Sequence, residues 1–141
     1  RAVEEYRFPT ASGRAKFHAL SLPDFAPLGE HQLRLMTIRS EGQFNAVVYD
    51  EEDIYRRQDR RDVILMNAAD ITRMGLAPNQ RVKIVSEAGE MRYILVREFE
   101  IRAGNAAMYF PEANVLVPPT VDPLSKTPAF KHVVITLTAE T

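Results

Sequence analysis

Short runs of apolar residues, several of them alternating with polar ones, recur along most of the chain. Alternation is typical of strands with one buried face, and a continuously apolar run of four indicates a buried strand. The predicted strands cover residues 32–39, 63–66, 81–87, 90–98, 106–110 and 130–138. Ala88 and Gly89 predict a tight turn between the third and fourth strands. Strands of similar length with short turns favour a mainly β fold, and a closed barrel leaves no strand edge exposed.

One short helix is predicted after the second strand. Asn67 can cap its N-terminus, and Asp70 lies in the first turn, where a carboxylate is favourable. Ile71 and Met74 share one helical face. Gly75 suits the left-handed backbone that ends many helices, so we expect the helix to end there.

The chain divides into two parts. We interpret residues 1–31 as a lead-in segment from a preceding domain and residues 32–141 as the barrel domain, because Pro23 and Pro27 interrupt regular structure before the first strand. Four apolar residues are expected to anchor the lead-in segment: Tyr6, Phe8, Phe17 and Leu20. The chain does not open on Met, so we expect it to be part of a longer protein.

Composition restricts the classes of function. The 141 residues suit one domain with its own core, and the net charge of -1 gives no overall attraction for nucleic acid or an anionic membrane. The absence of cysteine excludes disulfides, thiolate catalysis and cysteine-ligated clusters within this chain. No apolar run is long enough to insert into a membrane as a spanning helix. His18, His31 and His132 lack metal-ligand spacing, so we expect structural or surface roles for them.

A polar segment, residues 37–45, follows the first strand directly. Arg39 offers charge-assisted donors, and Gly42 lets backbone amides turn toward a phosphate or a purine edge. The same residues also suit an ordinary hydrogen-bonded turn. The local chemistry leaves both interpretations open.

Two further segments, residues 109–118 and 125–131, share this ambiguity. Asn114 stands among apolar neighbours, where its carboxamide needs a partner, and it is either a turn-stabilising residue or a ligand contact. Lys131 follows a proline turn, and it is either a surface lysine or a clamp for an anion or a ring carbonyl. The motifs HExxH, GxGxxG and the P-loop do not occur, so the local chemistry favours binding over turnover.

Residues 40–62 form a long irregular stretch with mixed charge. The acidic run of residues 50–53 precedes four arginines, which are Arg56, Arg57, Arg60 and Arg61. We interpret it as a solvated loop or short helix with self-compensating charge. The alternative is an arginine cluster that binds a phosphate or a partner domain. This alternative is considered because long loops in compact domains are often functional.

These segments, in this order, resemble the dinucleotide-binding domain of molybdopterin oxidoreductases, with formate-dehydrogenase-like alpha subunits the nearest group. The resemblance runs from about Leu33 to the end of the chain. It rests on residues 37–45, Tyr55-Arg56, Arg60-Arg61-Asp62-Val63, Met66-Asn67, Asp70, Gly75-Leu76, Arg81-Val82, residues 109–118 and residues 125–131.

The resemblance implies a six- or seven-stranded double-psi β-barrel, mainly β, with one or two short helices. It also implies the cofactor molybdopterin guanine dinucleotide, with molybdenum or tungsten held by the full-length protein. The cofactor-binding residues that it implies are Thr37, Arg39, Ser40, Gln43, Phe44, Asn45, Asn114, Phe130 and Lys131. It places no catalytic residue and no metal ligand in this chain.

For the parent protein, the resemblance implies a cytoplasmic oxidoreductase in which a 4Fe-4S cluster, where present, lies in an earlier domain. The expected partners are the remaining domains of the parent and an electron-transfer subunit. A non-catalytic adaptor module that binds a protein partner is the main alternative, because one fold can host unrelated functions. A self-processing decarboxylase would need a Gly-Ser pair, which the sequence lacks.

Two positions depart from the family pattern. The turn before Val82 usually carries Gly-Asp in the family and reads Asn79-Gln80 here, and Arg57 stands where glycine is frequent. Both positions lie outside the implied binding segments. We therefore expect them to affect turn geometry and not the class of ligand.

Overall fold

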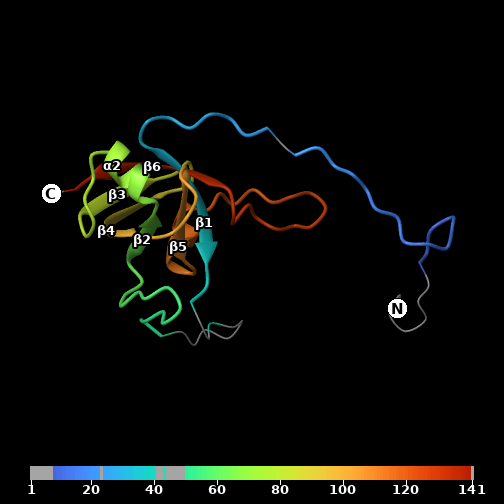
Figure 1. Ribbon diagram of the computed structural model, residues 1–141, viewed down its shortest axis with the longest axis horizontal. Coiled ribbons are helices and arrows are strands. Elements are labelled where there is room, and N and C mark those ends of the chain that lie inside the picture. Colours follow the sequence, from blue (N-terminus) through green and yellow to red (C-terminus); the bar gives the residue numbers. More distant parts are fainter. Residues whose placement is uncertain (1–7, 23, 41–42, 44–49, 141) are drawn as a thin grey trace.

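A computed structural model describes residues 8–22, 24–40, 43 and 50–140 of the chain (Figure 1). In this part of the chain, six strands close into a barrel, with one α-helix and one 3-10 helix. The elements are β1 (Gln32–Ile38), β2 (Val63–Met66), α2 (Ala68–Arg73), β3 (Arg81–Val85), β4 (Glu90–Glu98), β5 (Asn105–Tyr109), η1 (Glu112–Leu116) and β6 (Val133–Ala139). The predicted mainly β double-psi barrel is confirmed in its six-stranded form.

The strand order brings distant segments to one end of the barrel. Around the barrel the order is β1-β5-β2-β4-β3-β6. The pairs β1–β5 and β2–β4 are parallel, whereas the other neighbours are antiparallel. The C-terminal ends of β1 and β5 therefore lie beside the N-terminal ends of β2 and β6. We call this end of the barrel the site end.

The barrel interior is filled by the apolar face of each strand. β1 shows the expected alternation, with Leu33 and Leu35 fully buried, and all four residues of β2 are buried. Ile135 of β6 points into the same interior. Burial of a large aliphatic side chain contributes about 1.5–3 kcal/mol to the free energy of folding. The apolar residues whose alternation predicted the strands therefore also supply the main stabilising force.

One predicted strand ends earlier, and another begins later, than the sequence pattern suggested. The third strand stops at Val85, because the amide of Ser86 donates to the Gly89 carbonyl at 2.9 Å and closes the turn. The last strand begins at Val133 and not at residue 130, because the Phe130 amide donates to the Pro128 carbonyl. The turn before β6 therefore holds residues 130–132 outside the barrel wall.

The predicted helix forms α2, with both of its expected ends. The Asn67 side chain accepts from the Ala69 amide at 2.8 Å, as an N-cap does. Gly75 has a φ of +65°, and the amides of Gly75 and Leu76 donate to the Thr72 and Ile71 carbonyls. This pair of bonds is the Schellman ending. In the described part of the chain no helix has the length and apolar character that crossing a bilayer requires.

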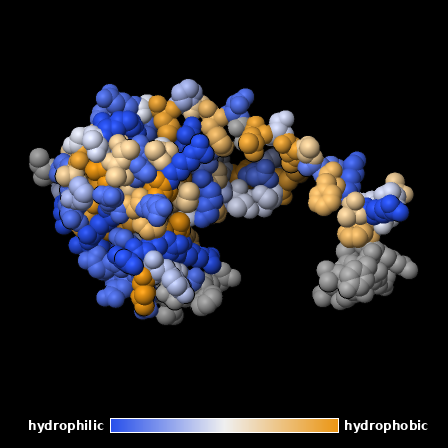
Figure 2. Space-filling view, in the orientation of Figure 1, coloured by the Kyte–Doolittle hydropathy of each residue, from blue (hydrophilic) through white to orange (hydrophobic). Residues whose placement is uncertain are grey.

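The lead-in segment extends away from the barrel, and residues 8–22 are exposed throughout (Figure 1). The expectation that apolar residues anchor this segment is wrong for Phe8, Phe17 and Leu20, which are 42%, 98% and 85% exposed. Figure 2 shows apolar side chains spaced along this arm, clear of the barrel surface. An apolar residue has nothing to bury against where the backbone leaves the domain. Tyr6 lies outside the described residues.

Contact between the arm and the barrel begins at Phe25. Its ring meets the His132 ring edge-on at a centroid distance of 4.6 Å, and the Arg34 guanidinium lies 5.3 Å from its centroid. Arg34 also donates to the Ala26 carbonyl at 2.7 Å. These contacts fix where the arm joins β1.

Both departures from the family pattern lie at residues with a left-handed backbone. Arg57 has a φ of +54° and Asn79 a φ of +65°. Glycine adopts this conformation without a Cβ penalty, asparagine tolerates it, and arginine does so at a cost. A left-handed backbone at both positions is consistent with the glycine that the resemblance implies there.

Candidate functional site

A pocket of about 310 Å³ opens at the site end of the barrel. It combines the last two residues of β1 and the residue after them, a residue that follows β5, and residues of the turn before β6. The lining residues are Thr37, Ile38, Arg39, Phe110, Phe130 and Lys131. Four of the residues predicted to bind the cofactor thus line one pocket, although nearly a hundred positions separate the first from the last.

The segments that form this pocket are joined by hydrogen bonds. The Thr37 amide donates to the Phe130 carbonyl at 2.9 Å, and the Thr37 hydroxyl donates to the same oxygen at 3.4 Å. In return, the Lys131 ammonium donates to the Thr37 carbonyl. Thr37 itself is 4% exposed. The end of β1 and the turn before β6 therefore form one wall.

The other wall carries a stacked pair of side chains. The Arg39 guanidinium lies over the Phe110 ring, 5.5 Å from its centroid. Arg39 is exposed and Phe110 is partly buried, so the guanidinium has its ring contact and also reaches solvent. A guanidinium is a planar, charged group that stacks on aromatic rings and donates hydrogen bonds in its plane, which suits the recognition of planar or anionic groups.

Ser40 and Gln43 lie behind this wall. Both are buried, and the Gln43 side-chain oxygen accepts from the Ser40 amide at 3.2 Å. The Gln43 side-chain nitrogen donates to the Phe110 carbonyl at 2.8 Å. The structure gives these two residues contacts within the protein, and neither lines the pocket. Phe44 and Asn45 lie outside the described residues.

Asn114 lies in η1, outside the set of residues that line the pocket. It is exposed, its amide donates to the Pro111 carbonyl at 2.9 Å, and its carbonyl accepts from the Val117 amide at 3.0 Å. These are the backbone contacts of any residue in a short 3-10 helix, so the role of the Asn114 carboxamide stays a prediction.

Sequence reasoning missed the most connected residue at this end of the barrel, Arg61. It precedes β2, is 4% exposed and lies 4.9 Å from the Tyr109 ring centroid. Its Nε and one terminal nitrogen donate to the Glu112 carboxylate at 2.6 and 3.1 Å. The other terminal nitrogen donates to the Ser40 hydroxyl at 2.8 Å. The sequence offered no local signal for this role, because Arg61 stands in a charged run between Arg60 and Asp62, just before β2.

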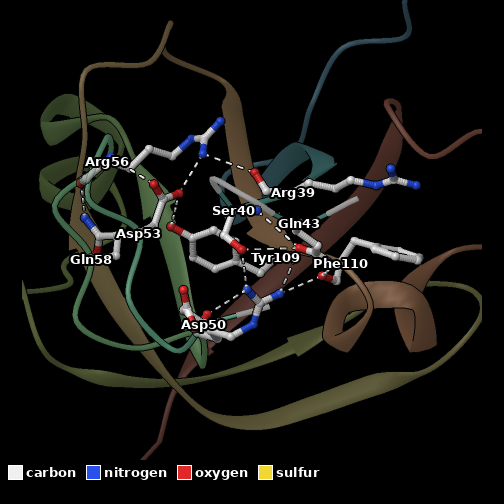
Figure 3. A network of polar contacts seen from close by, with 10 residues as sticks. Arg39, Ser40, Gln43, Asp50, Asp53, Arg56, Gln58, Tyr109 and Phe110 are labelled. Carbon is white, nitrogen blue, oxygen red and sulfur yellow. Dashed lines mark hydrogen bonds and ion pairs between the residues drawn. The ribbon is translucent and has the colours of Figure 1, made fainter. Parts of the chain in front are cut away.

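A second buried charge, Asp53, lies on the far side of the Tyr109 ring (Figure 3). It accepts from the Tyr109 hydroxyl at 2.9 Å and from the Arg56 guanidinium at 2.6 Å. Arg56 also donates to the Arg39 carbonyl at 3.2 Å. Burial by itself raises the pKa of Asp53, but the hydrogen bonds from Arg56 and Tyr109 outweigh it and hold that pKa below its usual value. Burial, together with the Asp53 carboxylate, raises the pKa of Tyr109.

The charges of residues 50–62 are balanced within the protein. Arg56 pairs with Asp53, Arg60 with Asp62, and Arg61 with Glu112. The interpretation of this stretch as self-compensating agrees with these pairs. Among its arginines Arg61 is buried and Arg57 is exposed, and none of them lines the pocket, which Arg39 does.

A larger groove of about 620 Å³ lies beside β6, and neither Arg39 nor Lys131 lines it. Its lining includes Val85, Val133 and Val134, with Glu87 and His132 as its ionisable groups. Size alone therefore does not identify the site. The smaller pocket has the chemistry that an anionic ligand needs, because two cations and two aromatic rings line it.

A closed barrel that gathers cations and aromatic rings in one end pocket defines a domain that holds an anionic, ring-containing ligand. The family model described as "Molydopterin dinucleotide binding domain" matches residues 33–134. The chain belongs to this family and is a molybdopterin dinucleotide-binding domain. The adaptor alternative is not favoured by this match.

Two curated relatives are similar to nearly the whole of this chain over a part of their own length. An uncharacterized oxidoreductase of Mycobacterium tuberculosis, Rv2900c, is 36% identical over 148 residues, which cover 97% of this chain and 19% of the relative. Protein YdeP of Escherichia coli K12 is 29% identical over 147 residues, covering 96% of this chain and 19% of YdeP. The chain thus spans about a fifth of the length of these curated relatives.

Among solved structures, acetylene hydratase from Pelobacter acetylenicus aligns with a TM-score of 0.57. The alignment covers 77% of this chain and 18% of that enzyme, at 14% sequence identity. At this identity the likeness shows a shared fold and no more.

Proposed function

We propose that this chain binds the guanine form of the cofactor, molybdopterin guanine dinucleotide, in the pocket at the site end. The observation that carries the proposal is the convergence of Arg39, Lys131 and the rings of Phe110 and Phe130 from three distant segments. The donor set fits the ligand. A pyrophosphate needs charge-assisted donors, and flat heterocycles stack on aromatic rings.

Each pocket residue has a separate part in this proposal. The Arg39 guanidinium, already stacked on Phe110, has the planar geometry that pairs with phosphate oxygens. The Lys131 ammonium is held at the Thr37 carbonyl and adds a second positive charge. The pocket of about 310 Å³ is small for a whole dinucleotide, so this chain would enclose one part of it. When bound, the cofactor supplies the metal and the two-electron chemistry, and the protein supplies position.

The rest of the site belongs, in this proposal, to the parent protein. Relatives about five times as long leave room for further domains that complete the pocket. We infer a molybdenum or tungsten oxidoreductase of the formate-dehydrogenase-like group, in which the remaining domains and an electron-transfer subunit are the partners. Positioning matters there, because a displacement of about 1 Å at a reacting centre can cost about 100-fold in rate.

Replacement of Arg39 by alanine in the full-length protein tests the cofactor site. Charge-assisted hydrogen bonds contribute about 1.5–3 kcal/mol, so we expect cofactor affinity to fall by about 10- to 100-fold. The measurement is molybdenum or tungsten by mass spectrometry, with guanosine monophosphate released by acid hydrolysis, per mole of folded protein.

The matched control is Arg14→Ala, because Arg14 lies on the exposed arm and away from the pocket. This variant should keep the cofactor content of the unaltered protein. Equal metal and nucleotide contents in the Arg39→Ala and Arg14→Ala proteins would rule out Arg39 as a cofactor contact. A parent protein that contains no guanine nucleotide would rule out the guanine form of the cofactor.

A further inference from the structure

We propose that Arg61 is the positioning residue of the cofactor pocket: its buried guanidinium joins the loop after β1 to the segment after β5. The proposal rests on the proposed function, since it explains how the cofactor-binding wall is built. Arg61 does not line the pocket and would act through Arg39 and Phe110.

The donors of Arg61 are matched to acceptors from separate parts of the chain. Its Nε and one terminal nitrogen bind Glu112, and the same terminal nitrogen donates to the Phe110 carbonyl at 2.6 Å. The other terminal nitrogen donates to the Ser40 hydroxyl at 2.8 Å and reaches the Asp50 carbonyl at 3.5 Å. Guanidinium carries five N–H donors in a rigid plane. One planar group therefore fixes the relative positions of the segments that it joins.

The location of these acceptors connects Arg61 to the pocket. Ser40 follows Arg39 directly, and the Phe110 carbonyl belongs to the residue whose ring lies under the Arg39 guanidinium. Gln43 strengthens the link, because its side chain binds both the Ser40 amide and the Phe110 carbonyl. The stacking distance between Arg39 and Phe110 thus depends on backbone that Arg61 holds. Figure 3 shows Ser40, Gln43 and Phe110 gathered beside Tyr109.

Direct contact between Arg61 and the cofactor is disfavoured by the same geometry. The side chain is 4% exposed, and a carboxylate, a hydroxyl and two carbonyls already accept its hydrogen bonds. A ligand phosphate could reach the guanidinium only if these bonds broke. The positive charge is also compensated by Glu112 within the protein.

A general stabilising role is the competing explanation, and Asp70 provides the control for it. Asp70 is 3% exposed and accepts from Arg73 at 2.8 Å and from the Gly104 amide at 2.6 Å. It follows β2 and faces the start of β5, so it lies at the opposite end of the barrel from the pocket. Asp70→Asn therefore weakens a buried ionic contact of similar kind without touching the pocket wall.

The experiment compares Arg61→Met, Arg61→Lys and Asp70→Asn in the full-length protein. Each is assayed for thermal unfolding and for metal and guanosine monophosphate per mole of folded protein. We expect Arg61→Met to lose at least 10-fold more cofactor than Asp70→Asn. Lysine restores the positive charge opposite Glu112, but its ammonium group lacks the planar set of donors with which a guanidinium bridges several acceptors. Arg61→Lys should therefore recover thermal stability over Arg61→Met while cofactor content stays low.

The proposal is overturned if Arg61→Lys or Arg61→Met keeps the cofactor content of Asp70→Asn. If neither Arg61 variant folds, Ser40→Ala decides the question, since it removes one bond of Arg61 and leaves the buried charge pair intact. A three- to ten-fold loss of cofactor in that variant supports the proposal, and unchanged content overturns it. If the unaltered protein contains no cofactor, the proposed function itself is wrong. That outcome differs from a failure of the Arg61 proposal, in which the unaltered protein contains the cofactor and the variants keep it.

Discussion

At the scale of single residues, the site end of the barrel depends on ionised side chains held in the interior. Asp53 is 1% exposed and joins Tyr109 to Arg56, and Arg56 in turn holds the backbone of Arg39. A buried carboxylate is tolerated when charged and neutral donors satisfy its oxygens. Acid should therefore weaken this part of the structure selectively.

The pH dependence of stability should reveal the ionisation of Asp53. Its pKa in the folded protein lies below the unfolded value of about 3.9, so the stabilisation is fully present above about pH 4. It is lost as the pH falls through the folded pKa. Asp53→Asn should cost about 2 kcal/mol at pH 7, the size of charge-assisted hydrogen bonds, and that difference should shrink toward pH 2. Urea unfolding at a series of pH values measures it.

The comparison with Asp53→Asn isolates this carboxylate from the others. Asp62, Asp122 and Glu140 also have lowered pKa values, but they titrate equally in both proteins and cancel in the difference. A stability difference that stays constant from pH 7 to pH 2 would show that Asp53 does not ionise as described.

At the scale of elements, the turn that contains Arg57 holds a residue that differs from the glycine frequent in the family. The turn that contains Arg57 is closed by paired backbone bonds between Asp53 and Gln58, at 2.8 and 3.1 Å. The closed turn forces Arg57 into the left-handed region, with its φ of +54°. The surrounding contacts therefore impose a conformation that an arginine side chain disfavours.

Replacement of Arg57 by glycine should stabilise the chain. Relief of the left-handed conformation is worth about 1–2 kcal/mol, and the greater entropy of unfolded glycine offsets about 0.5–1 kcal/mol of this. We expect a net gain of about 0.5–1 kcal/mol in the free energy of unfolding, measured by urea titration. Arg57→Ala is the control, because it removes the guanidinium but keeps the Cβ, and it should bring no gain. Equal effects of the two changes would assign the gain to charge.

At the scale of the whole molecule, the described part of the arm leaves the barrel. Its residues 8–22 are exposed, and among its described residues Phe25 and Ala26 contact the barrel. The boundary predicted between residues 31 and 32 stays a prediction, although β1 begins at Gln32. Exposed apolar side chains on such an arm contribute nothing to the stability of the barrel that they leave.

Removal of residues 1–22 from the 141-residue chain should change its free energy of unfolding by no more than about 0.5 kcal/mol, as for substitutions away from the core. Phe25→Ala should cost about 1 kcal/mol, because it removes the ring contact with His132 and the cation–π contact with Arg34. Chemical denaturation of both variants provides the comparison. A loss above about 1 kcal/mol on removal of the arm would show that the arm packs on the barrel.

The pocket residues were within reach of sequence reasoning because of where they stand along the chain. Arg39 and Lys131 lie beside strand ends, where a barrel exposes side chains and backbone groups. The role of Arg61 could not be predicted from the sequence, because its partners Ser40 and Glu112 are 21 and 51 positions away. Nothing in the local pattern distinguishes a buried arginine from the exposed arginines beside it.

The sequence by itself determined the local structure: strand positions, the Asn67 cap, the Gly75 ending and the polar character of the segments that follow the strands. These depend on side-chain periodicity and backbone preference, which act over a few residues. The tertiary structure alone decided which segments meet at one end, which arginine is buried and which residues face the pocket. Parallel pairing of β1 with β5 and closure of the barrel set those distances, because contacts between residues far apart in sequence arise only from the packed fold.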